Sequence, residues 1–181
     1  MDQSETKQGD SLRPTIRSIT EADLPTYHAF RLAGLRAHPE AFGETAEHFM
    51  TVTPAQIASR LKSSEARGGF ILGAFSEGTL LGVVGLARQE GEKMEHRATI
   101  WGMYVAPSAR GLGVGRDLMG ACLMRARQIP KLRQVHLCVV TSNQPAINLY
   151  RSFGFSSYGT DPAALKIGEQ LFDEELMVTV L

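Results

Sequence analysis

The order of apolar and polar positions predicts that the chain opens with a strand and a helix. Residues 15–19 alternate between polar and apolar, which is the period of a half-buried strand. Thr20 and Asp23 have the spacing of a capping box, so a helix is expected directly after them. The helical positions recur at steps of three and four residues: Leu24, Tyr27, His28, Leu32 and Leu35. Pro39 ends this helix, because a residue before proline is displaced from the helical region.

A second helix and three strand-like runs come next. The helix is expected to begin at Thr53-Pro54, with proline in its first turn, and to end at Gly68-Gly69. The strand-like runs are 70–75, 80–88 and 98–105, separated by turns at Glu77-Gly78 and 90–96. Residues 98–105 are largely apolar on both faces, which indicates a central strand.

The second half of the chain alternates helices with strands. The expected elements are a helix at 113–127, a strand at 135–140, a helix at 145–153 closed by Gly154, and strands near 155–158 and 171–181. Because a helix joins strands 98–105 and 135–140, these two should be parallel. The order β-α-α-β-β-β-α-β-α-β-β predicts an α/β fold with a central mixed β-sheet flanked by helices.

Length and composition indicate one folded domain. The chain has 181 residues, within the roughly 100–200 that a single core usually serves. Residues 14–181 contain no repeat, low-complexity tract or linker and are expected to form one domain, preceded by a flexible polar tail at 1–13. With 43% hydrophobic and 21% charged residues, the composition excludes a disordered or collagen-like chain.

Charge and cysteine content narrow the compartment and the partners. The 19 Lys and Arg balance 19 Asp and Glu, so we expect no nucleic acid partner and no anionic membrane surface. Cys122 and Cys138 lie in apolar runs and predict buried, reduced thiols, as in a cytoplasmic protein. No apolar run approaches the ~20 residues that span a bilayer, and the histidines lack the spacing of a metal site.

The most informative stretch is a glycine-rich turn between a buried strand and a helix. Gly111, Gly113 and Gly115 remove Cβ atoms where the backbone could approach a ligand, and the next helix opens with unpaired N–H groups. Arg110 and Arg116 flank the turn, which therefore suits a phosphate or pyrophosphate. The alternative is a turn that only packs a helix on a strand. The stretch has neither the Gly-Lys-Ser/Thr of a nucleoside-triphosphate loop nor the spacing of a dinucleotide fingerprint.

Two blocks of sequence give a family resemblance. Arg110 to Gly115, RGLGVG, resembles the Arg/Gln-x-x-Gly-x-Gly/Ala signature of the GCN5-related N-acetyltransferases, as does the preceding strand at 103–107. Asn143 to Phe155 resembles the N-x-x-A-x-x-L-Y-x-x-x-G-F block that comes after the next strand in that family. Together the blocks cover about residues 98–159, and the expected element order extends the match over 14–181.

The resemblance implies an acetyl-CoA site between two splayed parallel strands, here 98–105 and 135–140. By similarity, the backbone of Met103, Tyr104 and Val105 would pair with the pantetheine arm and hold the thioester carbonyl. Asn143 and Asn148 would contact the cofactor's arm. The residues implied to cradle the pyrophosphate are Arg110, Gly111, Leu112, Gly113, Val114, Gly115 and Arg116. No metal is implied.

Tyr150 is the catalytic residue that the resemblance implies. The family uses this tyrosine as the acid that returns a proton to the coenzyme A thiolate, and a phenol has a suitable basicity for that task. The alternative is a core position, because Ala146, Leu149, Tyr150 and Phe153 form an apolar stripe at helical spacing.

The general base is left open by the sequence. Many members place a glutamate on a splayed strand, but residues 135–138 contain His136 and Cys138 and no carboxylate. The candidates are Glu95, His96, His136, Glu174 and Glu175. Deprotonation into a water chain is a further alternative, and Cys138 could carry the acyl group only with an adjacent base and an exposed thiolate.

The acceptor would lie between residues 31–42 and 158–175. The carboxylates there that could receive an ammonium group are Glu40, Glu44, Asp173, Glu174 and Glu175. Arg31 or Arg36 could receive a carboxylate. The expected function is transfer of the acetyl group of acetyl-CoA to a primary amine by direct attack in a ternary complex. The acceptor could be a small amine, an amino acid, an antibiotic or a protein amine.

Two other functions stay open at this point. One is a non-catalytic acyl-CoA-binding or regulatory module, and the other is a nucleotide-binding domain of another fold. A homodimer formed through the sheet edge near the last strands is a further expectation.

Overall fold

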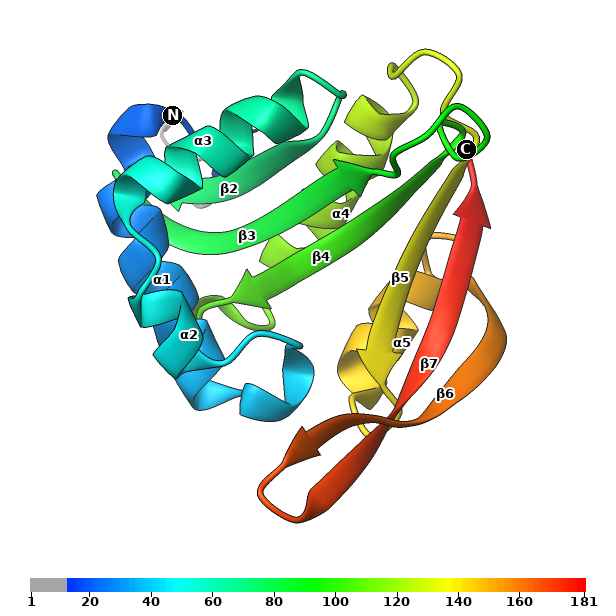
Figure 1. The fold of residues 1–181 in the computed structure, drawn as a ribbon. Helices are drawn as coiled ribbons and strands as arrows, with labels where there is room; N and C mark the ends of the chain where they lie inside the picture. The colour runs from blue at the N-terminus through cyan, green and yellow to red at the C-terminus, as the bar shows by residue number, and fades with distance from the viewer. Residues whose placement is uncertain (1–12) are drawn as a thin grey trace, which may run out of the picture.

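The computed structural model describes residues 13–181, and within that range seven strands form one sheet (Figure 1). They are β1 (Thr15–Ser18), β2 (Phe70–Ser76), β3 (Thr79–Arg88), β4 (Arg97–Val105), β5 (Gln134–Val140), β6 (Ser156–Ile167) and β7 (Gln170–Val180). The order is β1-β2-β3-β4-β5-β7-β6, antiparallel except for the parallel neighbours β4 and β5. The central place of β4 and its parallel pairing confirm the sequence predictions. The predicted tail, apart from Arg13, lies outside the described residues.

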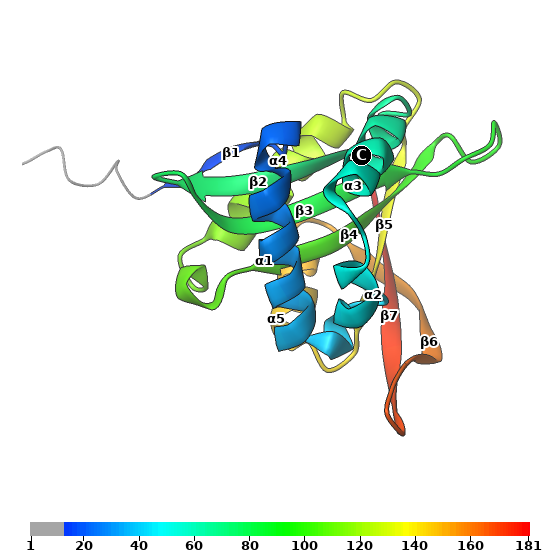
Figure 2. The ribbon, with the colours of Figure 1, turned by 60° about the vertical axis from the view of Figure 1, so that its left-hand side comes forward.

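Helices cover both faces of the sheet (Figures 1 and 2). They are α1 (Leu24–Ala37), α2 (Ala46–Met50), α3 (Pro54–Glu65), α4 (Val114–Ala126) and α5 (Gln144–Arg151). Figure 2 shows α1 to α3 in front of the strands and α4 behind them. One core lies under α4 and α5 around Leu118 and Ile147, and the other lies under α1 and α3 around Leu35 and Ile57. None of the described helices is long and apolar enough to cross a membrane.

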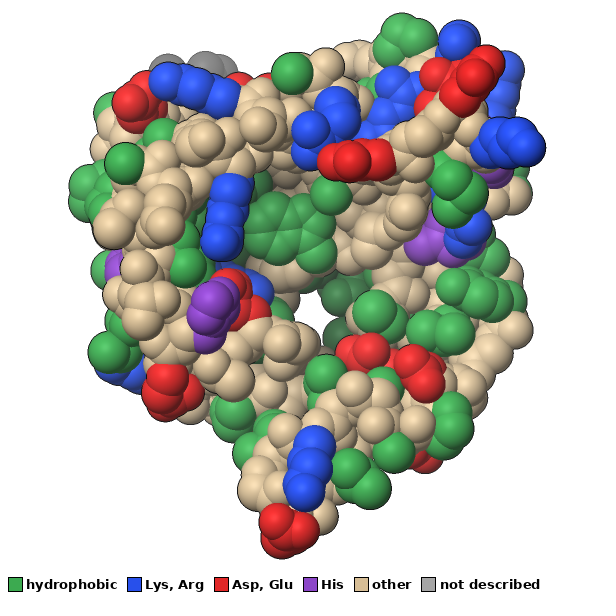
Figure 3. All heavy atoms as spheres, viewed as in Figure 1, with side chains coloured by type: hydrophobic (Ala, Val, Ile, Leu, Met, Phe, Trp, Pro, Cys, Tyr) green, Lys and Arg blue, Asp and Glu red, His purple; other side chains and the backbone are tan. Residues whose placement is uncertain are grey.

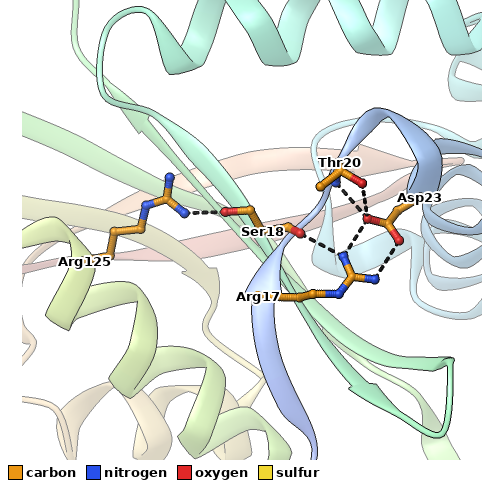
Figure 4. Close-up of polar contacts among 5 residues, drawn as sticks. All are labelled: Arg17, Ser18, Thr20, Asp23 and Arg125. Atoms are coloured by element: carbon orange, nitrogen blue, oxygen red, sulfur yellow. Dashed lines mark hydrogen bonds and ion pairs between the residues drawn. The ribbon is translucent and has the colours of Figure 1, made fainter.

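Asp23 joins the first strand to the first helix (Figure 4). Its carboxylate accepts two hydrogen bonds from the Arg17 guanidinium, at 2.7 and 2.8 Å. It also accepts from the backbone N–H and the hydroxyl of Thr20, at 2.8 and 2.7 Å. The expected capping box is thus present, but it caps the start of a short 3-10 helix, Glu21–Asp23, which precedes α1. Ser18 receives a further hydrogen bond from Arg125 of α4, which ties β1 to the opposite layer.

The structure adds two features that the hydrophobic pattern did not predict. Helix α2 is one and a half turns long and is capped by Thr45, whose hydroxyl accepts from the backbone N–H of His48. Strand β6 continues well past the predicted end at residue 158. The continuation contains Pro162 and Ala163, the latter at φ 54°, and its pairing with β7 shifts register between Asp161 and Leu165. Its residues are mostly exposed, so no hydrophobic alternation marks it as a strand.

Candidate active site

The site begins where β4 and β5 separate. Their parallel pairing covers only residues 97–99 of β4 and 134–136 of β5. From Ile100 onward, no strand within residues 13–181 pairs with the edge of β4 that faces β5. On the other edge, Tyr104 pairs with Val83 and Trp101 with Gly85, so two β4 residues oppose one residue of β3. The extra residue is a β-bulge, which bends the strand and changes the direction of the side chains after it.

Gly102 occupies the bulge in a conformation that favours glycine. Its φ is +63°, in the left-handed region where a Cβ atom is strained. A Cβ at this position would also lie 3.3 Å from Nη1 of Arg31 on α1. The bend in β4 therefore depends on a residue that the resemblance did not single out, although a glycine inside an apolar strand is itself a signal of a bulge.

A cleft of about 680 Å³ fills the space between the separated strands. That volume is within the range of small-molecule sites. Its walls are Ile100–Val105 of β4, Leu137–Val140 of β5, the glycine turn, one side of α5 from Pro145 to Tyr150, and His38, Glu40, Ala41 and Phe42 after α1. Figure 3 shows the opening near the centre of the molecule, with hydrophobic and acidic side chains on its border.

The glycine turn forms one end of the cleft. Gly111 and Gly113 have φ angles of 76° and 83°, and a Cβ built on either would meet nothing within 4 Å. Their backbone conformation, rather than crowding, thus calls for glycine. Gly113 is the N-cap of α4 and offers no side-chain cap, so the N–H groups of the first helical turn are free to bind an anion. Gly115 packs closely, because a Cβ there would lie 3.4 Å from Leu149.

Two arginines bring positive charge to this end. Arg110 donates to Nε2 of His38 at 2.8 Å and to the carbonyl of Val105 at 3.3 Å. Arg116 lies over the ring of Phe153, 5.7 Å from its centroid. Both line the cleft. The positive helix terminus and two guanidinium groups fit the pyrophosphate of a coenzyme A molecule.

The remaining residues implied for the cofactor divide into two groups. Met103, Tyr104, Val105, Val114 and Asn143 line the cleft. Asn143 also caps α5 by accepting from the N–H of Ala146 at 3.3 Å. Leu112 is 70% exposed and Asn148 lies on the exposed side of α5, and neither borders the cleft. Trp101, which the sequence reasoning passed over, does border it.

Tyr150 reaches the cleft from α5. Its side chain is 8% exposed, and its hydroxyl donates to Sδ of Met103 at 3.8 Å. Burial and the nearby Cys138 raise the pKa of Tyr150 to about 12. The hydroxyl is therefore protonated throughout the physiological range and can donate a hydrogen bond.

Cys138 corrects one sequence prediction. The apolar run predicted two buried thiols, but only Cys122 is buried, and Cys138 is exposed at the cleft because β5 has parted from β4. Burial of part of the side chain and the adjacent Glu174 raise the pKa of the Cys138 thiol to about 11. At neutral pH it is a thiol, which disfavours it as an acyl-carrying nucleophile.

The candidate bases lie in different surroundings. Glu95 pairs with Lys131 at 2.9 Å, and the backbone of His96 binds the start of β5, both at the end where β4 and β5 are still paired. His136 accepts from Arg97 at 3.1 Å, and its pKa is lowered by burial and by that charge. Glu175 is held by Arg151 at 3.0 Å on the α5 side of the sheet.

Glu174 is the candidate nearest the cleft. It lies on β7 next to Cys138 of β5, whose thiol is in the cleft wall, and the two groups shift each other's pKa. Burial raises the pKa of Glu174, the neighbouring Cys138 thiol opposes this rise, and the charge of Asp161 adds to it. Among the described residues, no group of His, Cys, Asp and Glu side chains could hold a metal ion.

Of the predicted acceptor region, only the segment after α1 lines the cleft, and no residue of 158–175 is in its wall. Residues 158–175 form most of the β6–β7 hairpin, in which Asp173 accepts from the N–H of Ala163 at 2.8 Å. Glu40 borders the cleft, whereas Arg36 is exposed on α1 and contacts Met50. Arg31 is 6% exposed, and burial lowers the pKa of its guanidinium.

Comparison with known proteins points to one family. The profile of the Acetyltransferase (GNAT) family matches residues 31–155. The chain is similar to a mycothiol acetyltransferase of Actinosynnema mirum, with 32% identity over 127 residues that cover 68% of this chain and 38% of the relative. It is also similar to the N-alpha-acetyltransferase RimI of Mycobacterium tuberculosis, with 38% identity over 49% of this chain and 52% of that protein. This match and those to two other mycothiol acetyltransferases each cover less than two fifths of the relative's length.

Solved structures share the fold. A GNAT acetyltransferase from Streptococcus pneumoniae superposes with a TM-score of 0.84 at 22% identity, covering 92% of this chain and 99% of that one. A ribosomal-protein-alanine N-acetyltransferase from Brucella melitensis superposes with a TM-score of 0.80 at 27% identity and the same coverage. A third, yncA from Salmonella typhimurium, was solved with its cofactor acetyl-CoA and has a TM-score of 0.80 at 20% identity, covering 92% of this chain and 93% of that one.

Proposed function

The chain belongs to the acetyltransferase (GNAT) family, and we propose that it transfers the acetyl group of acetyl-CoA to a primary amine by direct attack in a ternary complex. One observation carries the proposal. A single cleft brings together an open strand edge, an uncapped helix N-terminus with two arginines, and a protonated tyrosine. If the glycine turn only packed a helix on a strand, there would be no reason for these three features to line the same cavity.

The cofactor would lie along β4. The open edge at Met103 to Val105 offers backbone N–H and C=O groups to the amides of the pantetheine arm, as a neighbouring strand would. The N–H groups of Gly113 to Arg116, with the guanidinium of Arg110, would receive the pyrophosphate. Acetyl-CoA supplies the activated acyl group, and the chain positions it.

Tyr150 would complete the transfer. The neutral amine attacks the thioester carbonyl, the C–S bond breaks, and the coenzyme A thiolate takes the proton from Tyr150. An ordinary thiol with a pKa of about 8.5 would be a poor acceptor for that proton. Burial and the neighbouring carboxylates raise the pKa of the Cys138 thiol to about 11. A coenzyme A thiolate released in the same cleft would also be partly removed from water, which would raise its basicity toward that of Tyr150, whose pKa is about 12.

Glu174 would take the proton from the amine. It is the candidate carboxyl next to Cys138 of the cleft wall, and its raised pKa makes it a stronger base than an exposed carboxylate. It lies on β7 on the face of the sheet opposite α5, because its neighbour Glu175 binds Arg151 of α5, so base and acid would approach the reacting atoms from two sides. The alternative function is an acyl-CoA-binding module without catalytic activity. Turnover with any amine would exclude it.

Calorimetry with acetyl-CoA and coenzyme A tests the cofactor site directly. We expect micromolar affinity, about −8 kcal/mol, that is lost in Gly113→Glu because the new carboxylate enters the phosphate cradle. Gly78→Glu is the matched control, since Gly78 has a φ of 80° and, like Gly113, open space around its Cβ position, but lies in the β2–β3 turn. Equal loss in both variants, or no binding to the unaltered protein, would overturn the proposal.

A further inference from the structure

Arg31 is buried beside the cleft without a hydrogen bond. It lies in the third turn of α1, and its side chain is 7% exposed. Among residues 13–181, its Nη1 is the buried side-chain nitrogen or oxygen that has no hydrogen-bond partner. A guanidinium has five N–H donors, and leaving them unpaired in the interior is costly. Such a group is expected to have a partner that the protein chain itself does not supply.

The neighbours of Arg31 place it behind the cleft wall. Its Cζ lies 4.4 Å from the ring centroid of Phe42, and Nη1 would be 3.3 Å from a Cβ on Gly102. Phe42 and Gly102 both line the cleft. The guanidinium and the cleft thus share Phe42 and Gly102, and Gly102 places no side chain between them.

Glu44 does not satisfy the guanidinium. Its Oε2 lies 3.9 Å from Nη2, which is too long for a hydrogen bond, and its own side chain is 28% exposed. The Arg31 guanidinium therefore still has N–H donors without an acceptor. A carboxylate, which accepts two parallel N–H bonds from a guanidinium, is the group that matches these donors.

The position along β4 limits how far the carboxylate can be from the amine. Gly102 directly precedes Met103, the first residue proposed to hold the acyl arm, and adjacent Cα atoms are about 3.8 Å apart. We propose that Arg31 binds the carboxylate of the acceptor, and that the acceptor is an amine carrying this carboxylate within a few bonds, as in a free amino acid. This inference rests on the proposed acetyl transfer and names the acceptor class for the same cleft.

The alternative arginine provides a matched control. Arg36 lies five residues later on α1, is exposed, and has its guanidinium against Met50. The variants Arg31→Met and Arg36→Met make the same substitution on the same helix. Arg31→Lys keeps the charge without the planar fork.

The test compares free amino acids with their carboxamides as acceptors. A panel of the common L-amino acids and the matching amides is assayed for coenzyme A release at saturating acetyl-CoA. The amine of an amide is less basic and more of it is neutral, so a preference for the acid cannot arise from amine reactivity. We expect at least one amino acid to exceed its amide ten-fold in kcat/KM. In Arg31→Met the preference should fall below two-fold through the acceptor KM, with the KM for acetyl-CoA unchanged.

Two further measurements separate binding from folding. Trp101 is the only tryptophan in the chain and borders the cleft, so its fluorescence reports binding of N-acetyl amino acids, the reaction products. Arg31→Met should keep or raise Tm, because it removes an unpaired buried charge, whereas a structural arginine would lower it. Arg31→Lys should show an intermediate acceptor KM, and Arg36→Met should behave as the unaltered protein.

Each outcome decides the inference. Equal use of acids and amides overturns it, as does a preference that survives in Arg31→Met. If acetyl-CoA binds but no amino acid is acetylated and no N-acetyl amino acid changes the Trp101 signal, the inference also falls while the cofactor site stands. If acetyl-CoA itself does not bind, the proposed function fails instead.

Discussion

The hydroxyl of Tyr150 on α5 lies 3.8 Å from Sδ of Met103 on β4, across the opening between the two parallel strands. The helix after β5 thus places its only deeply buried phenol against the strand from which β5 has separated. The contact lies at the point where the acetyl group is proposed to be transferred.

Replacing Tyr150 by Phe should lower kcat about 100-fold while the affinity for acetyl-CoA is unchanged. The ring keeps its packing against Phe155, and only the proton donor is removed. Steady-state kinetics and calorimetry on the same preparation check this. Tyr158→Phe is the control, because Tyr158 is 56% exposed on β6. An unchanged kcat in Tyr150→Phe would rule out its acid role.

Glu174→Gln should lower kcat about 100-fold and change the pH profile. A base must be deprotonated, and the pKa of Glu174 is raised, so activity should fall on the acid side at a higher pH than for an ordinary carboxyl. In the glutamine variant this acid limb should disappear. Glu175→Gln is the control, since that carboxylate binds Arg151 on the other face. If the acid limb persists in Glu174→Gln, a group other than Glu174 is responsible for it, and Glu174 is not the base.

Asp23→Asn should cost about 1–2 kcal/mol of unfolding free energy at pH 7. Hydrogen bonds from Arg17, and from Thr20, hold the pKa of the Asp23 carboxyl well below its usual range. A depressed carboxyl pKa stabilises the folded state above the unfolded pKa, about 4, and the contribution is lost as the pH falls further. Urea titrations should therefore show the two proteins converging below about pH 4. Glu92→Gln, in the exposed turn before β4, should show no difference at either pH.

Gly102→Ala should destabilise the fold by about 1–2 kcal/mol, because an alanine is strained at φ +63°. Its methyl group would also press on Nη1 of Arg31. The two effects can be separated by a double-mutant cycle with Arg31→Met, measured by urea denaturation. The alanine should cost less in the Arg31→Met background. Equal costs in both backgrounds would show that the contact contributes nothing.

The sequence predicted most of the fold because the core strands and helices carry strong periodic signals. Residues 98–105, apolar on both faces, became the fourth of seven strands within the described chain, and the helix between β4 and β5 made them parallel. Strand β6 was cut short in the prediction because its exposed residues lack alternation. Helix α2 is too short for a periodic pattern to mark it.

The site was only partly readable for a different reason. The glycine turn and Tyr150 lie in local motifs, so their neighbours in the chain identify them. Glu174 and Arg31 lie next to residues of the cleft wall through strand register and helix packing, which no local spacing encodes. Cys138 shows the limit most directly, since an apolar run predicts burial but cannot show that the next strand has moved away.

The separation of β4 from β5 also bears on the handling of the free protein. Past residue 99, the edge of β4 toward β5 presents backbone donors and acceptors with no strand beside them in the described chain. Such an edge is a template for any extended peptide that can reach it. A bound acyl-CoA that runs along this edge would act as a missing strand and block that template. Coenzyme A added during purification should thus block strand pairing between copies at this edge as well as occupy the proposed cofactor site.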